Sequence, residues 1–210
     1  MPAPRRDWYA ITNRADQTEV LLFGEIDSWF GVSAEKFSAE LAALDVDRLT
    51  VRINSPGGSA FDGVAIFNAL ARHRARVITV VEGLAASAAS FIAQAGDERR
   101  ISKYGEMMIH DAAGVCIGDA ADMAAMSATL DQLSDNIAHI YADRAGGDVA
   151  VWRERMAAET WYSATDAVAA GLADAVDEPL AQTGAQARAY AVQLAAARRR
   201  RRNNQTTIGV

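Results

Sequence analysis

The sequence predicts an α/β fold in which helices cover a mostly parallel sheet. Along the first 110 residues, segments rich in apolar and β-branched residues alternate with segments of helical periodicity. A later segment, 119–144, is much longer and carries an apolar stripe at helical spacing. Alternation of strands and helices is typical of a sheet whose parallel strands are joined by crossover helices.

The expected strands are short and apolar, and the expected helices have recognisable ends. Residues 49–54 alternate, with Leu49, Val51 and Ile53 on one face. Ser33 is a plausible cap for one helix, and Ser163 caps another that Gly171 stops. The expected strands are 19–26, 49–54, 76–83 and 106–110. The expected helices are 33–44, 63–73, 83–96, 119–144, 149–158 and one after Ser163.

The segment 119–144 reads as one long helix. Asp119 can cap its start, and Gly146 and Gly147 end it. Its apolar stripe consists of Met123, Met126, Leu130, Leu133, Ile137, Ile140 and Tyr141. A stripe of this length either packs into the core or meets a partner subunit.

Composition narrows the class of protein. The chain has 210 residues and a net charge of −6, which gives a general nucleic-acid role no electrostatic support. A single cysteine, Cys116, excludes a disulfide framework and suits a reducing compartment. No apolar run follows Arg5 and Arg6, and no stretch is long enough for a membrane span. We therefore expect a soluble protein of the bacterial cytoplasm, without a signal peptide.

The predicted domain organisation is one folded domain, 1–180, followed by an Ala- and Arg-rich tail, 181–210. The tail contains five consecutive arginines, Arg198–Arg202. They form either a solvated end or a basic arm for acidic partners.

Two positions stand out as candidates for chemistry. Ser87 follows the strand 76–83 and a glycine turn, at or near the start of the next helix, where backbone N–H groups are unpaired. The N–H of Ala88 could therefore stabilise an oxyanion. His110 ends an apolar strand where a loop begins, and sites in α/β sheets collect at such ends. By contrast, His73 and His139 read as exposed, and Ser90, deeper in the helix, reads as structural.

The loop "NSPGGSAFDG" supplies a third component. Gly57 and Gly58 can present bare backbone N–H groups. The loop lacks the Gly-Lys-Ser/Thr ending of a phosphate loop, so an oxyanion or peptide-backbone site fits better.

Three motifs in this order, "INSPGGS", "GLAASAAS" and "MMIHDAAG", resemble the proteolytic subunit of the Clp protease, a serine peptidase of the crotonase-like fold. The resemblance runs from about residue 21 to 176. The segments "WYAITNRADQTEVLLFGEIDSWFG" and "ETWYSATDAVAAGLAD" look most like the phage and prophage branch, the head maturation proteases.

The resemblance implies repeated β-β-α units, a protruding long helix, and a site carried over by position. Ser87 matches the nucleophile and His110 the general base. Gly58 and Ala88 match the oxyanion donors, and Gly57 and Ser59 lie where substrate binds. The resemblance also implies a homo-oligomeric ring, which could be stacked in pairs, that acts on protein or peptide substrates such as capsid or scaffold proteins. No metal or organic cofactor is needed. The peptidase could work without ATP or with the help of an unfoldase.

The third member of a triad is less direct. The family carries an aspartate before an aromatic-apolar-Ser-Ala segment, and here "WYSA" places Glu159 at that position. A glutamate can orient an imidazole as an aspartate does. Alternatively, Glu159 is a solvated residue, and a carbonyl or water holds His110. Asp111 and Asp166 are poorer candidates, because Asp111 points to the opposite face and Asp166 serves the first turn of a helix.

Two other functions remain open. An acyl-CoA hydratase or isomerase of the same fold would also use two backbone N–H groups, but it gives no reason to pair Ser87 with His110. A catalytically inactive ring component that binds capsid or scaffold protein would keep the long helix without an activated serine.

Overall fold

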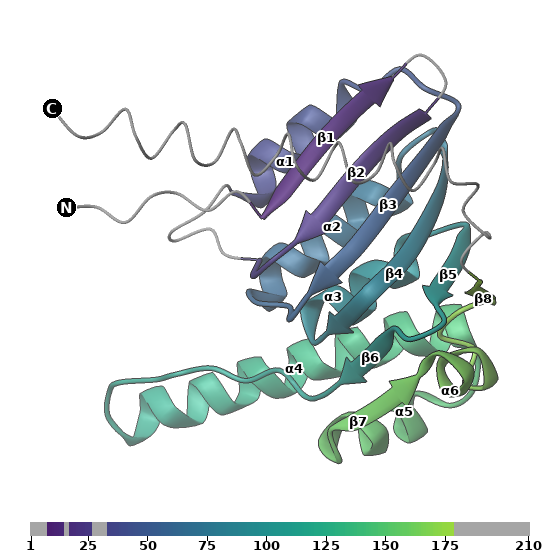
Figure 1. Ribbon diagram of the computed structural model, residues 1–210. Coiled ribbons are helices and arrows are strands. Elements are labelled where there is room, and N and C mark those ends of the chain that lie inside the picture. Colours follow the sequence, from purple (N-terminus) through teal and green to yellow (C-terminus); the bar gives the residue numbers. More distant parts are fainter. Residues whose placement is uncertain (1–7, 15–16, 27–32, 179–210) are drawn as a thin grey trace, which may run out of the picture. The chain divides into compact units, whose positions relative to one another are not determined.

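The computed structural model describes residues 8–14, 17–26 and 33–178, and its central feature is a mixed sheet (Figure 1). Within these residues the strands are β1 (Tyr9–Arg14), β2 (Gln17–Phe23), β3 (Arg48–Ser55), β4 (Arg76–Ala86), β5 (Glu98–Ser102), β6 (Glu106–Ile109), β7 (Thr160–Ser163) and β8 (Ala175–Asp177). The helices are α1 (Ala34–Ala42), α2 (Ala60–Ala71), α3 (Ala88–Ile92), the 3₁₀ turn η1 (Ala93–Ala95), α4 (Ala120–Ala145), α5 (Val149–Ala157) and α6 (Ala164–Ala169).

The sheet is mostly parallel, as predicted. Its main path runs β1-β2-β3-β4-β5-β8, and among the described strands only β1 on β2 and β7 on β6 pair antiparallel. Strand β4 pairs with β3 along one edge and is long enough to pair with two strands along the other, with β5 along residues 78–81 and with β6 along residues 84–86. The carboxyl ends of the parallel strands β3, β4 and β6 therefore open toward one edge of the sheet (Figure 1).

The segment 83–96 differs from its prediction as a helix. Strand β4 continues to Ala86, and helix α3 starts only at Ala88. The alanines here have high helix propensity, but Leu84–Ala86 pair with Glu106–Met108 and Ala85 pairs with Ser55. Pairing on both edges outweighs local propensity, and it carries the sheet up to the residue before Ser87.

Other element boundaries also shift from the sequence prediction. Helix α2 begins at Ala60 rather than Gly63, because the hydroxyl of Ser59 accepts the N–H of Asp62 and caps the helix earlier. Strands β1, β5, β7 and β8 were not predicted. They are three to six residues long, and strands this short give only a weak sequence signal.

The long helix agrees with its prediction. Asp119 forms a capping box with Asp122, and Gly146, at φ +82°, ends the helix. Its apolar stripe has two environments: Leu133, Ile137 and Tyr141 are buried, whereas 44% of Met123 is exposed. The C-terminal half therefore packs in the core, and the N-terminal half extends beyond the sheet (Figure 1).

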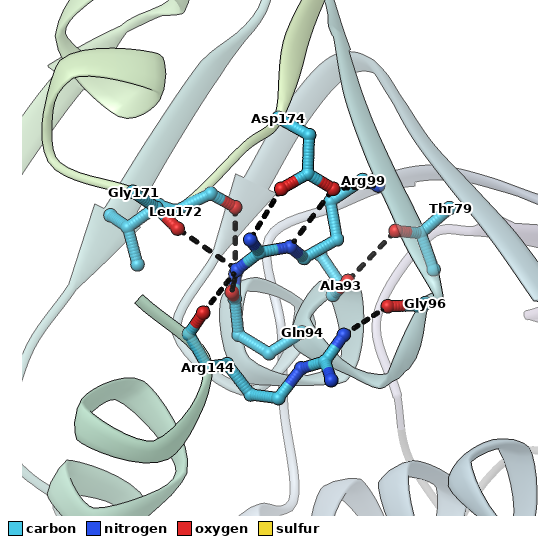
Figure 2. Close-up of polar contacts among 9 residues, drawn as sticks. All are labelled: Thr79, Ala93, Gln94, Gly96, Arg99, Arg144, Gly171, Leu172 and Asp174. Carbon is cyan, nitrogen blue, oxygen red and sulfur yellow. Dashed lines mark hydrogen bonds and ion pairs between the residues drawn. The ribbon is translucent and has the colours of Figure 1, made fainter. Parts of the chain in front are cut away.

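A partly buried polar cluster around Arg99 joins the end of α4 to the sheet (Figure 2). The guanidinium of Arg99 donates to Asp174 at 2.5 Å and to the side-chain oxygen of Gln94 at 2.9 Å. It also donates to the carbonyl oxygens of Arg144 and Gly171 at 3.1 and 2.9 Å. Because its oxygen accepts from Arg99, Gln94 turns its amide nitrogen toward the carbonyls of Ser90 and Leu172. The cluster therefore fixes the helical segment that follows Ser87.

The predicted tail, 181–210, and its arginines, Arg198–Arg202, lie outside the described residues, so the predicted domain division stays a prediction. Among the helices that the structure describes, none is both long and apolar enough to cross a membrane.

Candidate active site

The structure brings Ser87 and His110 together. Their strands, β4 and β6, are parallel neighbours, with Ala86 opposite Met108, so the residues that follow each strand meet at one edge. Nε2 of His110 lies 2.7 Å from Oγ of Ser87. A serine hydroxyl that donates to an imidazole at this distance can pass its proton to the ring as it attacks. In that arrangement the ring accepts at Nε2 and carries its own proton at Nδ1.

The backbone of Ser87 has an uncommon conformation. Its φ is +53° and its ψ is −124°, and Glu159 is the only other non-glycine residue with positive φ in the described ranges. Such a conformation costs about 1–3 kcal/mol and persists where the surroundings fix it. The N–H of Ser87 donates to the carbonyl of Met108 at 2.9 Å, which ties the turn to β6.

The glycine loop lies directly against this turn. A Cβ on Gly57 would lie 2.7 Å from Cβ of Ser87 and 2.8 Å from the backbone nitrogen of Ala88, so only glycine fits at this position. The hydroxyl of Ser55 accepts the N–H of Gly57 at 3.0 Å and donates to the carbonyl of Gly24 at 2.6 Å. These bonds hold the loop beside the serine.

The two predicted oxyanion donors, Gly58 and Ala88, are available. The chain around Gly58 bonds to Ile26 through Gly57 and Ser59, which leaves the N–H of Gly58 itself without an acceptor among the described residues. The N–H of Ala88 likewise has no acceptor in the described part of the chain. Because an oxyanion hole needs backbone donors without internal partners, both groups are suited to that role.

Ser59, predicted to contact substrate, caps helix α2 through its hydroxyl, which accepts the N–H of Asp62 at 3.3 Å.

The backbone of Glu159 lies beside the Ser87–His110 pair, but its carboxylate bonds to neither residue. Thr160 pairs with Ile109, so the register places Glu159 across from His110. Its carboxylate is exposed and accepts from the indole nitrogen of Trp161 at 3.3 Å. No carboxylate of the described residues bonds to His110, and Asp111 pairs instead with Arg153 at 2.6 Å.

The remaining histidines lie apart from this pair. His139 is exposed, as expected. His73, also expected to be exposed, is half-buried: its Nε2 lies 3.2 Å from the carbonyl of Leu41, and its Nδ1 accepts the N–H of Ala75. The first contact joins the segment after α2 to helix α1, and the second closes a local turn, so both are structural. In the ranges described, no three His, Cys, Asp or Glu side chains are placed to hold a metal ion.

Sequence reasoning placed Ser90 as structural, with a hydroxyl that bonds back to the backbone, but it did not find the bond between Ser90 and Tyr141. The hydroxyl of Ser90 bonds to the carbonyl of Ser87 and to the phenol of Tyr141, 51 residues away. Both side chains look like ordinary packing residues in the sequence, and no local pattern could have paired them.

A serine bonded to a histidine, beside two available backbone N–H groups at the carboxyl ends of parallel strands, is the arrangement of a serine hydrolase. The sequence model of the family described as Clp protease matches residues 4–179. The chain therefore belongs to the Clp protease family, whose proteolytic subunits are serine-type peptidases.

Individual relatives agree with the family match. The ATP-dependent Clp protease proteolytic subunit of Chlorella vulgaris is 30% identical over 177 residues, which cover 82% of this chain and 88% of the relative. Proteolytic subunit 3 of Rhodococcus jostii (strain RHA1) is 31% identical, with 79% of this chain and 84% of the relative covered. The subunit of Phalaenopsis aphrodite subsp. formosana is 32% identical, with coverage of 80% and 85%.

Proposed function

We propose that the chain is a serine endopeptidase in which Ser87 is the nucleophile and His110 the general base. The observation that carries this proposal is the 2.7 Å contact between Oγ of Ser87 and Nε2 of His110. A hydratase or isomerase would have no use for this contact, because it relies on carboxylates rather than on an activated hydroxyl.

The reaction follows from the positions of these groups. His110 takes the Ser87 proton while Oγ attacks the peptide carbonyl, and the oxyanion forms where the N–H groups of Gly58 and Ala88 can donate. The tetrahedral intermediate collapses as His110 returns the proton to the leaving amine. Water then repeats the sequence on the acyl-enzyme, with His110 again as base, and releases the acid. Each lost oxyanion donor typically costs about 3 kcal/mol of barrier.

Glu159 is proposed to orient His110 through Nδ1. Two features support this role: the register places it across from His110, and its backbone has φ +49°. Glycine would be the unstrained residue just after helix α5, so a glutamate there is kept at a conformational cost. Its carboxylate would have to turn from Trp161 to the imidazole.

Assembly and substrates are also proposals. Family membership supports a homo-oligomeric ring that acts on proteins, with Gly57 and Ser59 beside the bound peptide. Two exposed apolar residues, Val115 and Ile117, lie just before α4, and Met123 in its first turns is exposed as well. Stacking of rings at this protruding part would cover these side chains. Processing of capsid or scaffold proteins rests on the resemblance of the two quoted segments to head maturation proteases.

The test is replacement of the nucleophile. Ser87→Ala should abolish peptide cleavage and leave the fold and the assembly intact. Cleavage near the wild-type rate in Ser87→Ala, with loss in Ser90→Ala, would assign the nucleophile to Ser90 instead. Co-expression with capsid and scaffold proteins of a prophage tests the finer proposal, since their cleavage should require Ser87.

A further inference from the structure

Ser90 donates two hydrogen bonds to the carbonyl of Ser87. The N–H of Ser90 donates to this carbonyl at 3.0 Å, and its hydroxyl does so at 2.5 Å. The same hydroxyl lies 2.7 Å from the phenol oxygen of Tyr141 in α4. Because a carbonyl can only accept, the Ser90 proton points to Ser87, and Tyr141 must be the donor to Ser90.

This chain of donors is enclosed in the core. Ser90 is completely buried and Tyr141 nearly so, with its ring 5.5 Å from that of Trp152. Burial raises the pKa of Tyr141, although its bond to Ser90 works in the opposite direction. The phenol therefore remains protonated and able to donate. Phenylalanine in place of Tyr141 and alanine in place of Ser90 would fill the same space without burying two hydroxyl groups.

The peptide group between Ser87 and Ala88 links this chain of donors to the chemistry. The carbonyl of Ser87 and the N–H of Ala88 belong to one planar trans unit and point in opposite directions. A carbonyl anchored toward Ser90 in the core therefore aims the N–H of Ala88 away from it, where no described residue accepts it. The same anchor restrains the positive φ of Ser87.

We propose that Ser90 and Tyr141 are positioning residues that aim the oxyanion donor Ala88 and hold Ser87 in its strained conformation, an inference that rests on Ser87 being the nucleophile. Tyr141 acts by directing the Ser90 proton onto the carbonyl. In Tyr141→Phe, the Ser90 hydroxyl can still donate to the carbonyl of Ser87, but no phenol donates to the Ser90 oxygen. Without Ser90, the carbonyl keeps only the backbone bond.

The experiment compares Ser90→Ala and Tyr141→Phe with a control in strand β4 whose hydroxyl bonds to the helical segment that follows Ser87. Thr79→Val is the matched control, because the buried Thr79 hydroxyl donates to the carbonyl of Ala93 at 2.8 Å (Figure 2). Among the described residues, this hydroxyl forms no hydrogen bond with Ser87 or His110. For each variant we would measure kcat and KM on a peptide, the rate of labelling by a fluorophosphonate, the melting temperature and the assembled mass.

The positioning role predicts losses in chemistry rather than in binding. Ser90→Ala should lower kcat and the labelling rate about tenfold or more, Tyr141→Phe severalfold, and KM should change little in either. Thr79→Val should lower the melting temperature by about as much as the other two variants do. Its rates should nevertheless stay within twofold of wild type. The double variant should be no slower than Ser90→Ala, because both changes break one chain of donors.

Rates in both variants that match those of Thr79→Val would overturn the proposal and leave Ser90 and Tyr141 with a structural role. If Ser90→Ala does not fold, Tyr141→Phe, which removes one oxygen atom, decides the question in the same way. Failure of the proposed function would look different, because wild-type protein would then take up no label at Ser87.

Discussion

The contact between Gly57 and the Ser87 turn leads to a quantitative prediction for Gly57→Ala. The new Cβ would lie 2.6 Å from the carbonyl oxygen of Ala86 and 2.7 Å from Cβ of Ser87. Since ordinary van der Waals contact begins near 3.4 Å, these atoms would have to move by about 0.8 and 0.7 Å. Misplacement of reacting groups by about 1 Å can cost about 100-fold in rate. We therefore expect kcat to fall by at least tenfold.

Backbone strain must be separated from this displacement. Gly57 has φ +93°, so any side chain there also strains the backbone by about 1–2 kcal/mol. Gly146→Ala is the matched control, because Gly146 has φ +82° and a Cβ there would meet nothing within 4 Å. Both variants should melt at lower temperature, but only Gly57→Ala should lose peptide turnover and fluorophosphonate labelling. Turnover of Gly57→Ala equal to that of Gly146→Ala would refute the reasoning.

Three further predictions concern the triad, the polar cluster around Arg99 and the assembly. Glu159→Gln should lower kcat at least about tenfold, or roughly 1.4 kcal/mol of barrier, and Glu159→Asp should keep part of the activity. Wild-type turnover in Glu159→Gln would leave a Ser87–His110 dyad. Glu154→Gln, on the exposed side of α5, controls for the lost charge. Burial raises the pKa of Asp174, but the stronger combined effect of its bonds to Arg99 holds that pKa below its usual range. The carboxylate therefore stabilises the fold above about pH 4 and loses this effect as the pH falls through its folded-state pKa, so the difference in melting temperature between wild type and Asp174→Asn should shrink from pH 7 to pH 3; a constant difference would contradict this role. Light scattering at micromolar concentration should give a mass several times that of the 22.4 kDa chain, and a fully active monomer would contradict the ring.

Local signals predicted much of this fold correctly. The long helix could be predicted at both ends, because Asp119 and Gly146 have the conformations that their residue types favour. The pairing of Ser87 with His110 came from the resemblance of the three motifs to the Clp protease family. The structure brings the two residues together because β4 and β6 are parallel neighbours, which places the residues after each strand at one edge.

Long-range interactions account for what the sequence could not predict. The alanines of 84–86 favour a helix locally, and only their pairing with β3 and β6 keeps them in a strand. No sequence pattern singled out Arg99, because its partners Arg144, Gly171 and Asp174 are 45 to 75 residues away along the chain. Ser90 could be predicted as structural from its place in a helix, but its bond to Tyr141 depends on how α4 packs.

Fluorophosphonate treatment followed by intact mass measurement and peptide mapping tests the central claim most directly. An activated serine predicts one adduct per chain, located on Ser87, with no adduct in Ser87→Ala and slow labelling in His110→Ala. An unmodified wild-type chain, or an adduct on another residue that persists in Ser87→Ala, would contradict the assignment of Ser87 and His110 as the catalytic pair.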